Sequence, residues 1–392
     1  MSHREARERQ GIHHMSMITT PLTPRSVMRT AMLRQPTERI PTMPQICHNV
    51  AIRIYESDNG GDWIDGLRRC LEDPTLVYDY VIRLVEQVGC DGLRLFVRPE
   101  PMKVRRIGDA LIVLDRDGDN RIGRIDTMGG GGFVPDRPTP PVETLCEAQE
   151  RLDNMVRHFS DEKMEMLSQA RERVPNLFVA SKPGDITMDT YCALRGRERA
   201  LSDLIERPDF VKAVMDMQAE AMIRRAEKLL PTSIDALYIS DPSASASLIS
   251  PKHFEQFCVP AYQKFCQHFQ DRDILIYLHI CGNSSPILEM MADTGVHAIE
   301  PLDPLGGVSV ADAKRRVGDR VALMGGVNTL SLSDGTEEEV RVEAIQKCEE
   351  GGPYGYVLAA GDMVPPGTPL ENLQALVDVA TNSLWQARTR TP

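Results

Sequence analysis

Short apolar runs recur along the chain and predict eight β-strands. Glycine, proline or polar residues bound each run, and most runs show no alternation of apolar and polar positions. Uninterrupted apolar strands are typical of a parallel sheet that is buried on both faces. The predicted strands are Pro44–His48, Leu93–Arg98, Leu177–Ser181, Ala236–Asp241, Leu275–His279, Ala298–Leu302, Val321–Gly326 and Tyr356–Gly361.

Helical patterns separate these strands from about residue 160 onward. Pro208 opens a stretch whose apolar residues recur at helical spacing, and Ser250-Pro251 is typical of an N-cap followed by proline in the first turn. Thr336 precedes three glutamates, which favour a helix N-terminus. Because strand and helix alternate through eight units, the sequence predicts one α/β fold, a (β/α)8 TIM barrel over residues 23–392.

The second strand–helix unit contains an insertion, and we expect a β-hairpin within residues 103–140. Its strands would be Ile112–Leu114 and Ile122–Ile125, joined by the turn Asp117–Asn120. The aspartates near this turn match a calcium loop only in part. Asn120 stands where a glycine is expected, and no glutamate closes the loop, so a plain turn is the favoured interpretation.

Composition and charge narrow the class of protein. The chain of 392 residues is 42% hydrophobic, which is enough apolar material for a large core. Its net charge of -12 disfavours a nucleic-acid binder, which usually presents a basic face. No apolar run approaches the roughly 20 residues that a membrane-spanning helix needs.

The N-terminus and the cysteines indicate a cytoplasmic protein. Residues 1–22 are polar and arginine-rich without the apolar core of a secretory signal, and we expect them to form a disordered leader. The nine cysteines show no paired spacing, which suits a reducing compartment better than a disulfide scaffold.

A candidate metal site lies where the predicted strands end. In a parallel barrel, functional residues lie at the C-terminal ends of the strands. His279 and Cys281 are two positions apart on an extended segment and therefore point to the same side. An imidazole and a thiolate are common zinc ligands, and Glu300 and Asp362 on nearby strand ends would add oxygen ligands. An incidental pair without a metal remains the alternative.

Other strand ends carry polar candidates with less specific patterns. Asp241 is a candidate catalytic residue, or else a turn or capping residue before proline. Glu300 is a candidate catalytic base as well as a candidate ligand. Ser243, Asn283 and Asn328 follow strand ends and are candidates for substrate binding.

The same segments resemble the uroporphyrinogen decarboxylase superfamily and, more narrowly, its methylcobalamin:coenzyme M methyltransferase branch. Residues 279–288, with the sequence HICGNSSPIL, are similar to the zinc motif of that branch. Residues 240–251, 313–325 and 365–372 resemble its other barrel-rim segments. The resemblance is specific from about residue 230 and weaker from residue 23.

This resemblance implies a zinc-dependent methyltransferase. A methylated corrinoid, carried by a partner protein or free, would exchange its methyl group with a small acceptor such as a thiol or tetrahydrofolate. Demethylation of a small methylated substrate is the reverse possibility. His279 and Cys281 take the positions of two zinc ligands, and Asp241 would orient the acceptor or contact the corrin. Asp362 stands where the branch has a cysteine ligand, so an oxygen donor would replace a sulfur donor.

Two other hypotheses come from the same resemblance. One is a decarboxylase or lyase that acts on a non-porphyrin carboxylic acid. Decarboxylation of porphyrinogens is not expected, because Pro41–His48 lacks the arginine motif that holds their carboxylates. The other is a non-catalytic protein that binds a corrinoid partner, which the aspartate at position 362 would fit. A homodimer is expected from the class of barrel.

Overall fold

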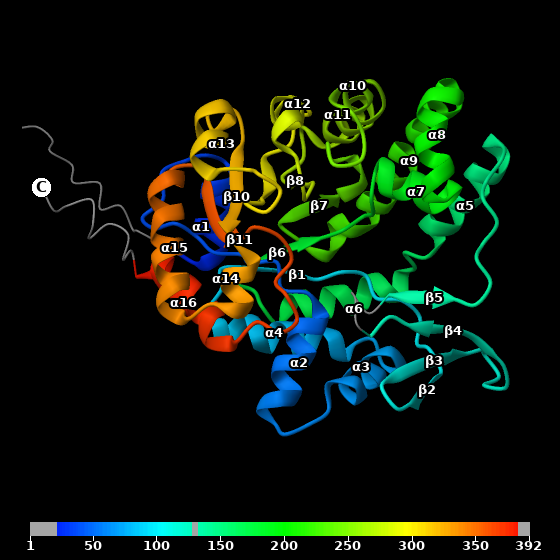
Figure 1. Cartoon of the computed structure of the whole chain (residues 1–392), viewed down its shortest axis with the longest axis horizontal. Helices are drawn as coiled ribbons and strands as arrows, with labels where there is room; N and C mark the ends of the chain where they lie inside the picture. The colour runs from blue at the N-terminus through cyan, green and yellow to red at the C-terminus, as the bar shows by residue number, and fades with distance from the viewer. Residues whose placement is uncertain (1–21, 128–131, 383–392) are drawn as a thin grey trace, which may run out of the picture.

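A sheet of seven parallel strands forms the centre of the computed structural model, which describes residues 22–127 and 132–382 (Figure 1). The expected leader, residues 1–22, lies outside the described residues except for Leu22. The strands follow the order β1-β6-β7-β8-β9-β10-β11, so each is adjacent to the next along the chain. Their bounds are β1 Gly92–Arg94, β6 Phe178–Ser181, β7 Ala236–Ser240, β8 Leu275–His279, β9 Ala298–Leu302, β10 Ala322–Val327 and β11 Tyr356–Ala360.

An irregular closure segment, residues 41–45, lies between the two edge strands of this sheet. Thr42 forms a parallel bridge with Leu358 of β11, and its carbonyl oxygen accepts from the amide of Asp91 at 2.9 Å, next to β1. The ring therefore closes as predicted for a barrel. The predicted strand Pro44–His48 is wrong in its second half, because His48 already begins a helix. Prolines in the closure segment lack amide donors, which prevents a regular ladder.

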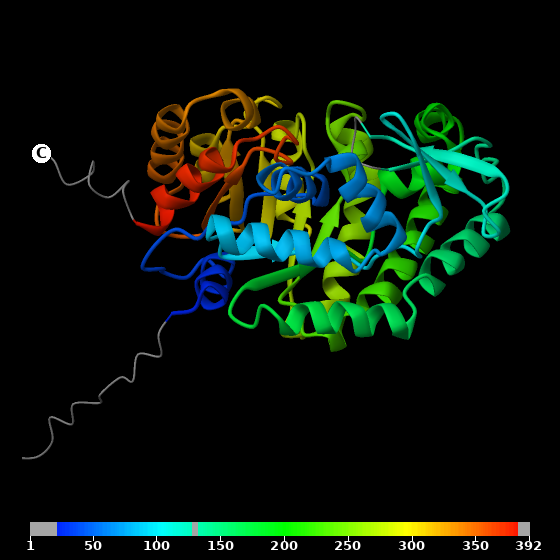
Figure 2. The same ribbon diagram turned by 90° about the horizontal axis from the view of Figure 1, so that it is seen from below.

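Helices surround the ring on its outside (Figures 1 and 2). One exception is α1, which packs Met28 and Met32 against the inner core of the barrel and contacts β1, β6, β10 and β11. The helices are α1 Pro24–Met32, α2 His48–Asp58, α3 Trp63–Glu72, α4 Leu76–Val88, α5 Leu145–Arg157, α6 Asp161–Glu172, α7 Met188–Arg195, α8 Arg197–Glu206, α9 Pro208–Leu229, α10 Pro251–His253, α11 Val259–Phe269, α12 Leu288–Ala292, α13 Val310–Val317, α14 Thr329–Asp334, α15 Glu337–Gly351 and α16 Leu370–Thr381.

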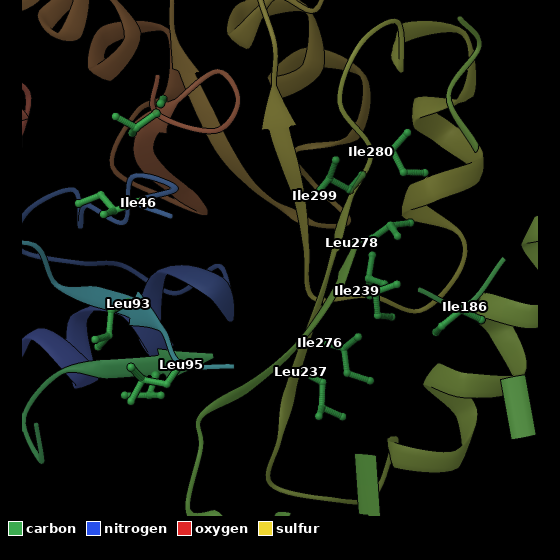
Figure 3. Packing of buried hydrophobic residues seen from close by; sticks show 14 of the residues in the cluster. Ile46, Leu93, Leu95, Ile186, Leu237, Ile239, Ile276, Leu278, Ile280 and Ile299 are labelled. Carbon is green, nitrogen blue, oxygen red and sulfur yellow. The ribbon is translucent and has the colours of Figure 1, made fainter. Parts of the chain in front are cut away.

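Alternate residues of each strand belong to two different cores. Leu237 and Ile239 of β7 pack with the helices in the large outer core, as do Ile276 and Leu278 of β8 (Figure 3). Tyr238 and Tyr277, which lie between them, belong to the smaller core inside the barrel. Because successive side chains alternate between faces, His279 follows Tyr277 on the inner side.

The insertion forms a separate antiparallel sheet of four strands, in the order β2-β3-β4-β5. The bounds are β2 Val104–Ile107, β3 Ala110–Leu114, β4 Arg121–Ile125 and β5 Phe133–Pro135. β3 and β4 pair within the range where a hairpin was expected. Because β2 and β5 add a strand on either side of this pair, the insertion is larger than that hairpin.

The turn between β3 and β4 satisfies its own carboxylate. Asp115 accepts hydrogen bonds from the amides of Gly118 and Asp119 and from the side chain of Asn120. This arrangement favours a plain turn over a calcium loop.

Within the part of the chain that the structure describes, no helix is long and apolar enough to cross a bilayer.

Candidate metal and active site

The three predicted metal ligands come together at the C-terminal end of the barrel. His279 is the last residue of β8, Cys281 follows it by two positions, and Asp362 follows β11. One ligand atom from each residue lies within 4.8 Å of the other two, and the distance from His279 Nε2 to Asp362 Oδ1 is 3.7 Å. His279 is buried, whereas Cys281 and Asp362 are half-buried. An imidazole, a thiol and a carboxylate at this spacing fit a tetrahedral zinc ion with one position left for a substrate.

The electrostatics of Cys281 favour a cation at this site. Burial raises the pKa of its thiol to about 12, and the neighbouring Asp362 contributes in the same direction. The thiol therefore keeps its proton at neutral pH in the protein alone. A bound cation reverses this preference, because a coordinating thiol is deprotonated. The donor set is thus better suited to hold a metal than to present a free thiolate.

A buried ion pair between Arg94 and Glu300 contacts His279. One oxygen of Glu300 lies 3.4 Å from His279 Nδ1, and the other accepts a hydrogen bond from the Arg94 guanidinium. Arg94 Nε also donates to the hydroxyl of Tyr277 at 3.0 Å. Burial alone would raise the pKa of Glu300, but Arg94 and His279 outweigh it and lower that pKa. Glu300 therefore carries a negative charge and accepts from His279 Nδ1, which leaves Nε2 directed toward Asp362.

The contacts of Glu300 with His279 and Arg94 bear on the proposed role of Glu300, and they bring in Arg94, which was not among the predicted site residues. A carboxylate held by arginine is a poor proton acceptor, so the geometry favours a positioning role for Glu300 over that of a base. Arg94 was missed, although the sequence contains a pointer to it. It lies between Leu93 and Leu95 in an apolar run, and a charge in a buried strand requires a buried partner.

Asp241 lies on the outer side of its strand, away from the three ligands, because it follows the outward Ile239 by two positions and so points to the same side. The buried carboxylate accepts from the amide and hydroxyl of Thr187 at 2.6 and 2.7 Å, from the amide of Asp189 at 2.8 Å and from the hydroxyl of Tyr262 at 2.9 Å. Burial, with nearby carboxylates, raises its pKa to about 7. The structure thus favours the alternative of a turn residue, one that joins the loops after β6 and β7.

The three candidates for substrate binding lie in different surroundings. Ser243 is buried and its hydroxyl donates to Asp189 at 2.7 Å. Asn328 uses its side-chain oxygen to cap α14. Asn283 is exposed, and its backbone N–H donates to the hydroxyl of Ser247 at 3.1 Å. Of the three, Asn283 alone has no hydrogen bond from its side chain to another described residue, and it remains available to a substrate.

The half-buried His48, at the start of α2, predicts an acid-sensitive fold. Burial lowers its pKa to about 4, and the nearby Arg98 adds to the effect. Between pH 6.5 and 4 the unfolded chain takes up a proton that the folded chain does not, so stability rises with pH across this window. We expect the free energy of unfolding to fall by about 2 kcal/mol from pH 6.5 to 4.5 through this residue.

Urea unfolding at several pH values measures this effect. His48→Gln is expected to flatten the dependence between pH 4.5 and 6.5, whereas His268→Gln, at a more exposed histidine beside Glu227, keeps the wild-type slope. Equal slopes for His48→Gln and the wild type would refute the assignment.

Comparison with known proteins identifies related sequences. Residues 144–383 match the family model described as uroporphyrinogen decarboxylase (URO-D). The chain is 36% identical to methylcobamide:CoM methyltransferase MtaA of Methanosarcina barkeri over 174 residues, which cover 44% of this chain and 49% of that protein. The matched region thus spans about half the length of that relative. A uroporphyrinogen decarboxylase of Pelodictyon phaeoclathratiforme is 25% identical and covers 89% of this chain and 95% of its own length.

A solved structure has the same fold. A methyltransferase from Methanosarcina mazei superimposes with a TM-score of 0.67 at 23% identity, covering 93% of this chain and 99% of that chain. The agreement extends over nearly the whole barrel and supports the architecture predicted from the alternation of strands and helices.

Proposed function

Since this chain belongs to the uroporphyrinogen decarboxylase (URO-D) family, we propose that it is a zinc-dependent methyltransferase that acts with a methylated corrinoid. The similarity to methylcobamide:CoM methyltransferases supports the class of reaction. The observation that carries the proposal is the convergence of His279, Cys281 and Asp362 within 4.8 Å at the barrel mouth.

These three residues would hold the zinc ion. When bound, zinc would keep a thiol acceptor in its thiolate form, which is the nucleophile. Glu300 accepts from His279 Nδ1 and keeps Nε2 on the side of Asp362, while Arg94 holds Glu300 in place. Such supporting contacts orient a ligand and raise its basicity.

The methyl group would move between a corrinoid and a small acceptor. The corrinoid would be supplied by a partner protein or arrive free, and the acceptor would be a thiol or tetrahydrofolate. In the transfer to a thiolate, the cobalt–carbon bond breaks with both electrons left on cobalt, and a carbon–sulfur bond forms. Demethylation of a small methylated compound is the same exchange in the opposite direction. The exposed Asn283 is the proposed contact for the acceptor.

A methyl-transfer assay tests this proposal. Zinc-loaded protein is incubated with methylcobalamin and a panel of thiols and folates, and the methylated product is measured by mass spectrometry. We expect a product that requires both the protein and zinc. Absence of any methylated product from protein with a full zinc complement would count against a methyltransferase.

A second candidate is a decarboxylase or lyase that acts on a non-porphyrin carboxylic acid. The observation that favours it is the sequence alignment of a uroporphyrinogen decarboxylase over 89% of this chain, whereas the sequence alignment with MtaA covers 44%. Release of carbon dioxide from a candidate acid without any corrinoid would separate it from the first. Tight binding of a corrinoid protein by metal-free protein, without turnover, would favour a third candidate, a non-catalytic partner.

A further inference from the structure

A polar cavity of about 660 Å³ lies between the first and the last loops of the barrel. Its wall comes from α2, from the start of α3, and from residues 366–371 at the start of α16. The last of these segments begins four residues after Asp362, so this part of the cavity wall follows the candidate metal ligand closely along the chain. Its volume is in the range that accommodates a small ligand.

Arg53 of α2 contributes a cation that forms no ion pair with a carboxylate within the part of the chain that the structure describes. Its guanidinium stacks on the ring of Trp63 at 3.5 Å, and its buried Nε has no hydrogen-bond acceptor among the described residues. Burial lowers the pKa of Arg53, and Cys47 is the one group that raises it. A guanidinium that is held in place by stacking and lacks an anionic partner is suited to receive an anion.

The N-terminus of α16 supplies further donors to the cavity wall. Pro369 occupies the N-cap position and has no side-chain acceptor for the first-turn amides, and the helix is 12 residues long. Next to it, Thr368 lines the cavity and is only 2% exposed. Its buried hydroxyl has no hydrogen-bond partner among the described residues. An uncapped helix N-terminus binds anions, because its amides and its dipole both favour negative charge.

Two carboxylates also line the cavity. Asp62 is already engaged, because it caps α3 through the amide of Ile64 and pairs with Arg106 at 2.6 Å. Glu371 is exposed in the first turn of α16. Neither one forms an ion pair with Arg53.

We propose that this cavity binds a phosphate group between Arg53, the Thr368 hydroxyl and the amides that begin α16. Phosphate is the anion that matches both a guanidinium and a helix N-terminus, and barrels often bind it at loops after their last strands. The volume leaves room for the molecule that carries the phosphate. That molecule is either a corrinoid with a nucleotide tail, which contains a phosphodiester, or a phosphorylated small molecule or free phosphate. The first source rests on the proposed methyltransferase function.

Titration calorimetry with inorganic phosphate tests the site in the full-length protein. We expect one phosphate per chain, with affinity lowered about tenfold or more in both Arg53→Gln and Thr368→Val. Arg68→Gln, at an arginine of α3 paired with Glu72, is the matched control and should bind phosphate like the wild type. Absence of saturable phosphate binding, or equal affinity in all four proteins, would overturn the proposal.

Steady-state kinetics with two corrinoids distinguish a phosphate in a corrinoid's nucleotide tail from a phosphorylated small molecule or free phosphate. Methylcobinamide lacks the nucleotide tail, so a tail site predicts that Arg53→Gln raises KM for methylcobalamin and leaves KM for methylcobinamide unchanged. If both KM values are unchanged while phosphate binding is lost, the site serves a phosphorylated small molecule or free phosphate. Zinc content is measured on the same samples. Phosphate binding in a protein without methyl transfer would thus contradict the proposed function while supporting the site.

Discussion

Replacement of His279 by alanine is expected to remove zinc binding and methyl transfer together. The variant loses the buried nitrogen that lies 3.7 Å from Asp362, and the two remaining donors cannot hold the ion in a protein that otherwise stays folded. Changes to residues that merely support a ligand reduce metal affinity roughly 10- to 100-fold, so loss of a ligand should reduce it by more than that. Metal analysis after dialysis and the methyl-transfer assay measure both effects.

Variants of Cys281 and Asp362 are expected to lower zinc binding to different extents. Cys281→Ser should lose zinc like His279→Ala, whereas Asp362→Ala should weaken binding less, because Asp362 is half-buried and water can replace its oxygen. Asp362→Cys should bind zinc more tightly, since a thiolate is the softer donor. Cys146→Ser, at an exposed cysteine, is the control. A wild-type zinc content in both His279→Ala and Cys281→Ser would refute the site.

Removal of the Arg94 guanidinium is expected to have the largest effect on stability. Arg94→Met leaves the carboxylate of Glu300 buried without its cation, and an uncompensated buried charge costs about 3–5 kcal/mol. Urea unfolding of wild type and variant at neutral pH measures this loss. A change below about 1 kcal/mol would show that Glu300 finds another partner or loses its charge at little cost.

The double variant Arg94→Met/Glu300→Gln distinguishes the ion pair from simple packing. Removing both charges should recover much of the stability lost in Arg94→Met, because no charge then remains unpaired. Zinc affinity should stay lowered roughly 10- to 100-fold, since the carboxylate that orients His279 is gone. The visible spectrum of the cobalt-substituted protein would report the altered ligand geometry. Unchanged zinc affinity in Glu300→Gln would contradict the positioning role.

The strands could be predicted best where the chain is most apolar. Leu275–His279 and Ala298–Leu302 have the predicted bounds, because strands buried on both faces leave unbroken apolar runs. Residues 41–45 were predicted poorly, since prolines and a bridge to distant Leu358 determine their geometry. The insertion was underestimated, because its outer strands are short and pair only in the folded sheet.

The convergence of His279, Cys281 and Asp362 could be predicted because their spacing and their places after strands are local features. The surroundings of Glu300 and Asp241 could not, because their partners lie far away in the sequence. Glu300 meets Arg94, 206 residues earlier. Asp241 and His279 both stand at strand ends, and only the alternation along each strand places one outside the barrel and the other inside.

The closure segment gives the metal site unequal mechanical support. Regular ladders on both sides hold β8, which positions His279 and Cys281. β11 pairs regularly with β10 alone, and its other edge meets the closure segment through isolated bridges. Fewer hydrogen bonds resist separation at that edge, so local opening of the ring costs least there. His279 and Cys281 thus follow a strand that is paired on both sides, and Asp362 follows one that is regularly paired on one side only. If these residues hold a zinc ion as we propose, Asp362 would be the ligand that moves most easily when a substrate binds.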